Sequence, residues 1–498
     1  MRTRASVEFS STQAEPVTVR GKGEDIKGGK KSSTTHQDTQ IVNFPHTLAM
    51  RTKSPLSQVS VLRLNHRWSM LVIFFCFLLV LGGFGGGTWL SIERQHQLVM
   101  ATAAARVDAK ATVSTYATAA ASTYATATDK GVQFGFDEAH THWNRYERVI
   151  NTANVPHLTK MWSYLTVGGI GSSPAVANGM VYIGSNDHRL YAFDATCRSA
   201  CTPLWSYLTA GSILSSPAVA NGMVYIGSRD HRLYVFDATC RSACTPLWSY
   251  LTVGGIGSSP AVANGMVYVG SDDHRLYVFD ATCRSACTPL WSYLTVGGIF
   301  SSPAVANGMV YVGSEDGRFY AFNAACRSAC LPLWSYPTAG PILSSPAVAN
   351  GMVYVGSNDS RFYAFDATCR SACTPLWSYL TAGYISSSPA VANGMVYVGS
   401  FDYAFYAFDA TCRSVCKPLW FYPTATYFRS SPTVANNVVY IGSDDHRLYA
   451  FDATCRSACT PLWSYFTDGY VESEPAVANG IVYVGSDGGS LYAFGLPS

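Results

Sequence analysis

Charged residues are scarce in this chain of 498 residues, since Asp, Glu, Lys and Arg together make up only 13% of it. The formal net charge is +3, so the chain as a whole lacks the strongly basic character expected of a nucleic-acid-binding protein. Amphipathic helical periodicity is also missing from its C-terminal two thirds. Aromatic residues, by contrast, account for 13% of the chain, and Tyr alone occurs 31 times. Low charge with abundant Tyr, Val and Gly favours β-sheet over helix.

One stretch near the N-terminus has no charged residue at all. Residues 69–90 read SMLVIFFCFLLVLGGFGGGTWL, which as a helix is long enough to cross a hydrocarbon layer of about 30 Å. Basic residues such as Lys53 and Arg67 precede it, and the positive-inside rule then places the N-terminus in the cytoplasm. A cleaved signal peptide is the competing interpretation, but its apolar run would begin far closer to the N-terminus. We expect a transmembrane helix over residues 68–91 in the cell membrane, a disordered cytoplasmic tail over residues 1–67, and the rest of the chain outside the cell.

The remainder of the chain is repetitive. A Trp recurs at a fixed interval of 43 residues, and the eight members of the series are Trp162, Trp205, Trp248, Trp291, Trp334, Trp377, Trp420 and Trp463. A period of this length indicates a propeller or a solenoid. Ahead of the repeats, residues 92–133 are rich in Ala and Thr and lack a heptad of large apolar residues, so we expect a linker there.

Each repeat unit contains four short candidate strands, for example residues 174–177, 180–184, 190–193 and 204–208. An Asn-Gly pair separates the first two strands, and this dipeptide is typical of a tight type I′ hairpin turn. Four short antiparallel strands per unit are typical of a propeller blade.

The two ends of the repeat region complement each other. The last of the eight units ends near residue 494 without a fourth strand, whereas residues 161–165 form an unmatched fourth strand ahead of the first unit. Pairing the two would close the ring and remove the free edges of a linear array. The sequence therefore predicts an all-β fold over residues 134–498, an eight-bladed β-propeller of four-stranded antiparallel blades preceded by one transmembrane helix.

Cysteine follows the same period. Of the 15 Cys residues, 14 form Cys-x3-Cys pairs in the loop before the fourth strand: Cys197/Cys201, Cys240/Cys244, Cys283/Cys287, Cys326/Cys330, Cys369/Cys373, Cys412/Cys416 and Cys455/Cys459. Zinc is the alternative, but a tetrahedral zinc needs four ligands, and each pair supplies two with no His in its own loop. We expect a local disulfide in each loop, which requires Cα atoms within about 7 Å. Disulfides are typical of oxidising compartments, in agreement with a propeller outside the cell.

The end of the third strand carries a motif that points to a family. The chain reads AFDAT over residues 192–196 and continues to Trp205, with a Cys pair inserted where a Gly would stand. This pattern resembles the Ala-x-Asp-x-x-Thr-Gly…Trp docking motif of the pyrroloquinoline quinone (PQQ) repeat, found in quinoprotein dehydrogenases and in their non-enzymatic relatives. The resemblance implies that each of the eight Trp side chains docks on the neighbouring blade.

The resembled family includes enzymes and non-enzymes. Its dehydrogenases hold PQQ and calcium above the central channel, with an adjacent Cys-Cys disulfide and long insertions that carry the catalytic Asp and the calcium ligands. This chain has no adjacent Cys pair and no insertions in its blades, and the paired Glu472 and Glu474 are too few to make such a site. The Asp-rich turns, such as residues 186–188, lack the spacing of a calcium loop. We expect no catalytic residue, cofactor or metal, with a PQQ- and calcium-dependent dehydrogenase as the alternative.

Differences among the eight units fall in two sets of loops, the turn between the second and third strands and the connection to the next blade. In a four-stranded meander these loops share one face of the disc, and aromatic residues and Arg in loops are typical of binding patches. The varied residues gather in the later blades: Tyr384, Phe401, Tyr403, Tyr427, Phe428, Arg429, Tyr470, Glu472 and Glu474. We interpret the chain as an extracytoplasmic binding or scaffold module for a protein or other ligand, with no nucleic-acid partner. Drift among duplicated repeats is the alternative explanation.

Overall fold

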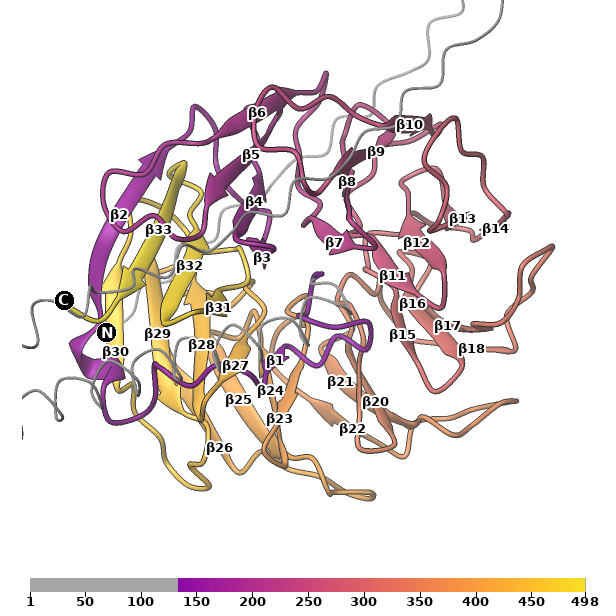
Figure 1. Ribbon diagram of the computed structural model, residues 1–498. Helices are drawn as coiled ribbons and strands as arrows, with labels where there is room; N and C mark the ends of the chain where they lie inside the picture. Colours follow the sequence, from indigo (N-terminus) through magenta and orange to yellow (C-terminus); the bar gives the residue numbers. More distant parts are fainter. Residues whose placement is uncertain (1–132, 498) are drawn as a thin grey trace, which may run out of the picture. The chain divides into compact units, whose positions relative to one another are not determined.

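The computed structural model describes residues 133–497, which form eight β-sheets set around a central axis as the blades of a propeller (Figure 1). Each sheet has four antiparallel strands, and one sheet has a fifth strand at its inner edge, so the predicted eight-bladed propeller is confirmed. The predicted tail (residues 1–67), the predicted transmembrane helix (68–91) and nearly all of the predicted linker (92–133) lie outside the described residues. Within residues 133–497, no helix is both long and apolar enough to span a membrane.

The strands occupy four equivalent positions in every blade. The innermost strands are β3 (Ala175–Ala177), β7 (Ala218–Ala220), β11 (Ala261–Ala263), β15 (Ala304–Ala306), β19 (Ala347–Ala349), β23 (Ala390–Ala392), β27 (Thr433–Ala435) and β31 (Ala476–Ala478). The second strands are β4 (Met180–Gly184), β8 (Met223–Gly227), β12 (Met266–Gly270), β16 (Met309–Gly313), β20 (Met352–Gly356), β24 (Met395–Gly399), β28 (Val438–Ser443) and β32 (Ile481–Gly485).

The third strands are β5 (Arg189–Asp194), β9 (Arg232–Asp237), β13 (Arg275–Asp280), β17 (Arg318–Asn323), β21 (Arg361–Asp366), β25 (Ala404–Asp409), β29 (Arg447–Asp452) and β33 (Ser490–Gly495). The outermost strands are β6 (Trp205–Leu208), β10 (Trp248–Leu251), β14 (Trp291–Leu294), β18 (Trp334–Pro337), β22 (Trp377–Leu380), β26 (Trp420–Pro423), β30 (Trp463–Phe466) and β2 (Thr159–Leu165). A short strand, β1 (Trp143–Asn144), and a 3-10 turn, η1 (Val155–His157), precede β2. We number the blades 1 to 8 in the order of their innermost strands.

The ring closes through its N-terminal strand. Strand β2 pairs antiparallel with β33, with Ser163 opposite Tyr492 and Tyr164 opposite Leu491, and so supplies the outermost strand of blade 8. The innermost strands neighbour one another in sequence order, and β31 in turn neighbours β3. The predicted closure by residues 161–165 is therefore confirmed, and it completes the four-stranded sheet of the last blade beside the first.

The Asn-Gly turns lie on one face of the disc. In blade 1, Asn178 has φ 53° and Gly179 has φ 72°, and two consecutive positive φ values define the type I′ turn that suits the twist of a hairpin. This turn sets the register in which Ala177 pairs with Met180 and Ala175 with Tyr182. The loops that contain the Cys pairs lie on the same face, because each is two strands further along the meander. We call this the constant face and the opposite one the varied face.

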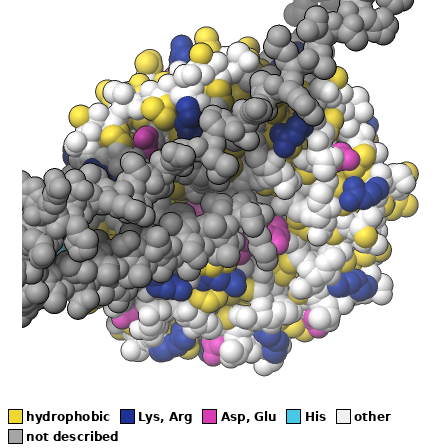
Figure 2. All heavy atoms as spheres, viewed as in Figure 1, with side chains coloured by type: hydrophobic (Ala, Val, Ile, Leu, Met, Phe, Trp, Pro, Cys, Tyr) yellow, Lys and Arg dark blue, Asp and Glu magenta, His cyan; other side chains and the backbone are white. Residues whose placement is uncertain are grey.

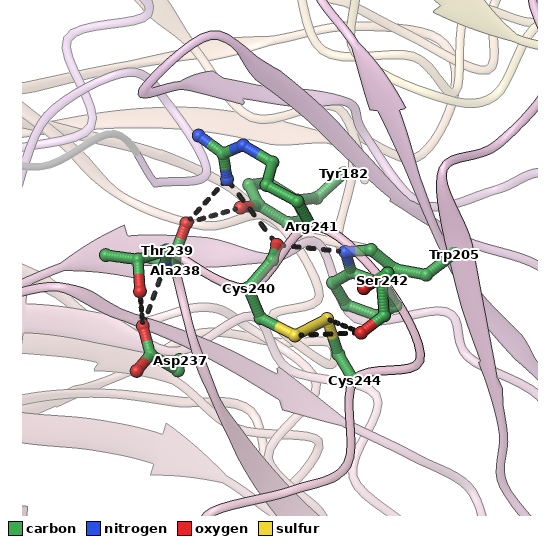
Figure 3. Close-up of a disulfide and its surroundings, with 9 residues drawn as sticks. All are labelled: Tyr182, Trp205, Asp237, Ala238, Thr239, Cys240, Arg241, Ser242 and Cys244. Atoms are coloured by element: carbon green, nitrogen blue, oxygen red, sulfur yellow. Dashed lines mark hydrogen bonds between the residues drawn. A yellow bond between two sulfur atoms is a disulfide. The ribbon is translucent and has the colours of Figure 1, made fainter.

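A repeated set of contacts joins each blade to the next. Trp205 of blade 1 packs against Phe236 of blade 2 with ring centroids 5.7 Å apart, and its Nε1 donates to the Cys240 carbonyl at 3.2 Å (Figure 3). The Tyr182 hydroxyl of blade 1 donates to the Ala238 carbonyl at 3.2 Å. The interface therefore combines buried aromatic area with two hydrogen bonds to carbonyls of one loop.

A disulfide closes the loop that carries these carbonyls. Cys240 and Cys244 are bonded, as are the six equivalent pairs, with Cα–Cα distances of 6.0 to 6.3 Å. Two hydrogen bonds from Thr239 to the Asp237 carboxylate order the start of the loop and lower the pKa of that carboxylate (Figure 3). From the same loop, Arg241 donates back to the carbonyl of Asn178 in blade 1 at 2.8 Å. Each predicted disulfide thus fixes the conformation of a loop that contacts the preceding blade.

One cysteine of each disulfide belongs to the core between blades. Cys244 is buried in the same cluster as Trp205 and Phe236, whereas Cys240 is only partly buried at the edge of that cluster. The second cysteine is buried in the six equivalent pairs as well: Cys201, Cys287, Cys330, Cys373, Cys416 and Cys459. The predicted local disulfides are therefore confirmed, and the structure adds a contact with the neighbouring blade. The spacing predicts the seven bonds, but it does not show that the loop folds inward and places one sulfur against the neighbouring blade.

Blade 8 interrupts this pattern because its third strand ends the described chain without a Cys loop. Trp463 of blade 7 donates instead to the carbonyl of Leu158, just before β2, at 3.1 Å. The hydroxyl of Tyr440, which is equivalent to Tyr182, is buried and has no hydrogen-bond partner among the described residues. The same side chain is therefore bonded in one interface and unpaired in another.

This difference gives a test of the interface hydrogen bond. We expect Tyr182→Phe to lower the free energy of unfolding by about 1 kcal/mol, because it removes one buried hydrogen bond, while the Ala238 carbonyl keeps the bond that it accepts from Arg241 at 3.1 Å. The matched change Tyr440→Phe removes a hydroxyl that has no partner and should be neutral or slightly stabilising. Denaturant or thermal unfolding of the two variants makes the comparison, and an equal loss in both would show that the hydrogen bond contributes nothing.

Candidate functional site

A segment of the chain itself enters the central channel (Figure 1). Residues 133–144, which we call the channel segment, run along the inner edges of blades 3 to 8, and their carbonyls accept hydrogen bonds from the middle Val of successive innermost strands. The donor and acceptor pairs are Val305 to Glu138 (2.5 Å), Val348 to Ala139 (2.8 Å), Val391 to Thr141 (2.8 Å) and Val434 to His142 (2.8 Å). The side-chain oxygen of Gln133 accepts from the Val262 N–H at 2.7 Å. The segment thus satisfies inner-edge amides that would otherwise line the channel.

A ring of serine hydroxyls surrounds the channel. In blades 1 to 6, the N–H of the second Ser in the Ser-Ser-Pro motif donates to the hydroxyl of its equivalent in the next blade, at 2.8 to 3.0 Å. These Ser residues are Ser173, Ser216, Ser259, Ser302, Ser345, Ser388 and Ser431. The eighth position is occupied by Glu474, whose N–H donates to Ser173 at 3.0 Å. One carboxylate therefore replaces a hydroxyl in an otherwise uniform ring.

Glu474 anchors the channel segment. It is only 6% exposed, and its carboxylate lies 2.6 Å from Nδ1 of His142 and accepts hydrogen bonds from Thr433 Oγ1 at 2.9 Å and from the Gly135 N–H at 3.3 Å. Thr433 is itself a departure from the repeat, because the other seven blades have Ala at that position. The expectation that Glu474 belongs to an exposed binding face is wrong, because the carboxylate is turned into the channel.

A second histidine of the channel segment is completely buried. His140 has no exposed surface, and Phe134 packs edge-on against both His140 and His142 at 5.4 and 5.2 Å between ring centroids. Burial, together with the neighbouring His142, lowers the pKa of His140 to about 3. The neutral imidazole is the form that fits the channel.

The attachment of the channel segment should therefore depend on pH. While bound, His140 stays neutral down to about pH 3, whereas in a released segment it would bind a proton near its ordinary pKa of 6.5. Stability is then complete above pH 6.5 and is lost as the pH falls towards 3. We expect faster hydrogen exchange at the Val305, Val348 and Val391 amides at pH 4.5 than at pH 7, after correction for intrinsic rates.

The control for this measurement is His140→Asn, which tolerates the positive φ at this position and does not titrate. It should flatten the pH dependence, while the amide of Val181 within blade 1 should be insensitive in both proteins. An unchanged pH dependence in the variant would assign the effect to another group.

The predicted binding face carries a compact aromatic cluster on blades 6 and 7, where Phe401 and Tyr427 lie 4.8 Å apart, Tyr403 and Tyr427 5.2 Å, and Tyr384 and Phe401 6.4 Å between ring centroids. Tyr384 and Tyr403 are 55% and 44% exposed. We call these four residues the blade 6 patch. Blades 1 to 5 mostly carry Gly, Ser, His or charged residues at the equivalent positions.

Arg429 contacts two rings of the blade 6 patch. Its guanidinium stacks over Phe401 at 5.6 Å and Tyr427 at 5.9 Å, and it forms ion pairs with Asp444 at 3.0 Å and Glu472 at 2.5 Å. Burial raises the pKa of Asp444 to about 6, although Arg429 opposes the shift. The arginine is half-exposed and held by both carboxylates and aromatic faces, so its position is ordered before any partner arrives.

Not every residue predicted for this face lies on it. Phe428 is completely buried, with its ring 5.9 Å from Phe405 and 6.4 Å from Tyr449, because it takes the core position that Ile385 holds in the preceding repeat. The prediction is wrong for Phe428. Tyr470 is exposed and lies beside His446 at 5.0 Å.

Sequence reasoning missed two residues of blade 6. In blade 1, Arg189 donates to the Ser206 hydroxyl at 3.1 Å across the two outer strands, and this pair recurs in most blades. In blade 6 the two positions hold Ala404 and Phe421, and the Phe421 ring is 57% exposed. A position-by-position comparison of the outer strands in the sequence reveals this extension of the apolar surface.

The arrangement does not fit the cofactor pair of a quinone dehydrogenase. Across residues 133–497, no group of three or more His, Cys, Asp or Glu side chains is placed to hold a metal ion. Glu472 is paired with Arg429 on the varied face, whereas Glu474 is buried against His142, so these two carboxylates do not converge on one site. The described residues thus do not supply a calcium site for a bound quinone, and no catalytic step follows from them.

Comparison with known protein families gives one matching model. A PQQ-type repeat model, described as outer membrane protein assembly factor BamB, matches residues 159–254, 217–287, 243–329 and 417–496. A comparison with curated protein sequences gives no match.

Solved structures with the same fold include both branches of this repeat type. BamB from Moraxella catarrhalis is 17% identical, covers 68% of this chain and 99% of its own, and has a TM-score of 0.55. A europium-containing methanol dehydrogenase is 14% identical, with 74% and 99% coverage and a TM-score of 0.63. Quinohemoprotein alcohol dehydrogenase from Comamonas testosteroni is 15% identical, with 76% and 84% coverage and a TM-score of 0.61. At these identities the likeness establishes the fold and does not separate a scaffold from an enzyme.

Proposed function

The chain belongs to the PQQ-type repeat family described as outer membrane protein assembly factor BamB, and from this premise we propose that it is a binding or scaffold module for a protein partner. The observation that carries the proposal is the blade 6 patch. In a ring of nearly identical blades, exposed aromatic residues and an ordered Arg gather at one place on the varied face. Such residues dominate the energetics of protein interfaces.

The proposed location is outside the cytoplasm, with a membrane anchor formed by residues 68–91. Seven disulfides in the propeller support an oxidising compartment. On the face drawn in Figure 2, Lys and Arg side chains are spread around the disc rather than gathered in one basic patch. This distribution favours a protein over a nucleic acid as the partner.

Blade 2 provides a template for testing the patch. Replacing Tyr384→Ser, Tyr403→His, Ala404→Arg and Phe421→Ser gives blade 6 the residues that blade 2 already carries at these positions. The backbone should accept the change, because Tyr403 and the equivalent His231 have φ values of 72° and 71°. We expect an unchanged melting temperature and loss of partner capture, measured by cross-linking the native and reverted proteins in their own extracellular fraction and comparing the captured proteins by mass spectrometry.

The control exchanges residues between blades outside the patch. His231→Ser and Leu214→Ser introduce Ser at two positions of the same face, as found in blades 5 and 6. Partner capture should survive this exchange. If the reverted blade 6 variant captured the same proteins as the native chain, the patch would not be the binding surface.

The dehydrogenase alternative is tested by titration with PQQ and calcium, followed by absorbance and calorimetry. We expect no saturable binding and no reduction of a dye acceptor, because the carboxylates of the described residues do not converge on a calcium site. Stoichiometric binding would contradict the scaffold proposal and restore the enzyme.

A further inference from the structure

The constant face contains a cavity of about 590 Å³ that the blade 6 patch does not share. It lies between residues 136–146 and the innermost ends of blades 4 to 6. A cavity of this size is within the range of sites that hold small organic ligands and is far larger than the space of one water molecule. Exposed lining residues, including Asn307 and Tyr146, bring its mouth to the surface.

Three aromatic side chains line one wall of the cavity: Phe136, Trp143 and Tyr146. Phe136 and Tyr146 lie 6.3 Å apart with tilted rings, and the Arg145 guanidinium sits 5.0 Å above the Trp143 ring. Flat aromatic faces beside open space are suited to the C–H faces of a pyranose ring as well as to other apolar groups.

The opposite wall repeats one polar group. Asn307, Asn350 and Asn393 occupy the same turn position in blades 4, 5 and 6, with φ values of 53°, 53° and 52°. Their backbone carbonyls already accept hydrogen bonds from Arg side chains of neighbouring blades. The side-chain amides of Asn307 and Asn350 make no hydrogen bond to any other residue between 133 and 497. Asn307 and Asn350 can therefore each donate and accept at once, as vicinal hydroxyl groups require, whereas the Asn393 amide already donates to the side chain of Asn437 at 3.1 Å.

Charges of both signs surround the cavity, and the Arg side chains of the neighbouring blades are already bonded to the Asn carbonyls of its wall. Asp137 and Glu138 are opposed by Arg145, and the Asp137 carboxylate is already occupied by the N–H and hydroxyl of Thr141 at 2.9 and 2.7 Å. The lining therefore has no large excess of one sign of charge that would attract a strongly charged ligand. Identical amides on consecutive blades suit a ligand that itself repeats. We propose that this cavity binds a neutral oligosaccharide, with sugar faces on the aromatic wall and hydroxyl groups on the amide wall.

The test uses the full-length protein and three neutral probes with different linkages, maltotetraose, cellotetraose and chitotetraose, measured by calorimetry. We expect at least one to bind and its affinity to fall at least tenfold in the double variant Asn307→Gly/Asn350→Gly. Glycine keeps the positive φ of the turn and removes only the amide. The matched control, Asn178→Gly/Asn221→Gly, changes the same turns in blades 1 and 2 outside the cavity and should bind like the native chain.

Two further measurements complete the test. Tyr146→Ala removes an exposed ring of the aromatic wall and should weaken the same probe, while 0.5 M NaCl should leave binding to the native chain unchanged because the ligand is neutral. The proposal is overturned if none of the three probes binds at millimolar concentration. It is equally overturned if the control variant loses as much affinity as the cavity variant, or if binding disappears in salt. None of these results bears on the blade 6 patch.

Discussion

The propeller depends on contacts between blades, because a sheet of four short strands is too small to enclose a core of its own. Each blade buries its Trp and Tyr side chains against the next one and directs their polar atoms at the carbonyls of one loop, as Trp205 and Tyr182 do with Cys240 and Ala238. Those carbonyls can act as fixed acceptors because a disulfide closes the loop. The loop's Arg returns a hydrogen bond to the preceding blade, so adjacent blades are connected in both directions.

This dependence decides where the surface can vary. The Asn-Gly turns and the disulfide loops all lie on the constant face, where the backbone carbonyls of the Asn residues and of the disulfide loops form hydrogen bonds between blades. On the varied face, the connections contribute one buried residue each to the core between blades, such as Ile213 or Phe428. The exposed positions of these loops take no part in the Trp, Tyr and disulfide-loop contacts, so they can carry Tyr384 or Tyr403 without weakening the ring. The blade 6 patch therefore lies where substitutions have little effect on the stability of the ring. Phe421, which extends the patch, lies on an outer strand and also makes none of these contacts between blades.

The channel segment breaks the eightfold similarity of the constant face. Eight similar blades would surround a channel lined by unpaired amides, and the segment satisfies four of these amides with its own carbonyls and a fifth with the side chain of Gln133. The segment is anchored by Glu474 and Thr433, two residues that differ from their equivalents in the other blades. The cavity beside blades 4 to 6 exists because this segment crosses there, which gives a symmetric ring one distinct site on its otherwise uniform side.

Residue spacing was sufficient to predict the eight blades, the closing strand, the disulfides and the face that varies. These features follow from period, alternation and turn chemistry, which act over a few residues and repeat eight times. Burial was not predictable in the same way: Phe428 and Glu474 differ from their equivalents much as Tyr427 and Glu472 do, yet the first pair is inside and the second outside. That outcome depends on which neighbouring strand and which part of the channel segment each side chain meets. The pairing of His142 with Glu474 joins residues 332 positions apart, and only the folded ring brings them together.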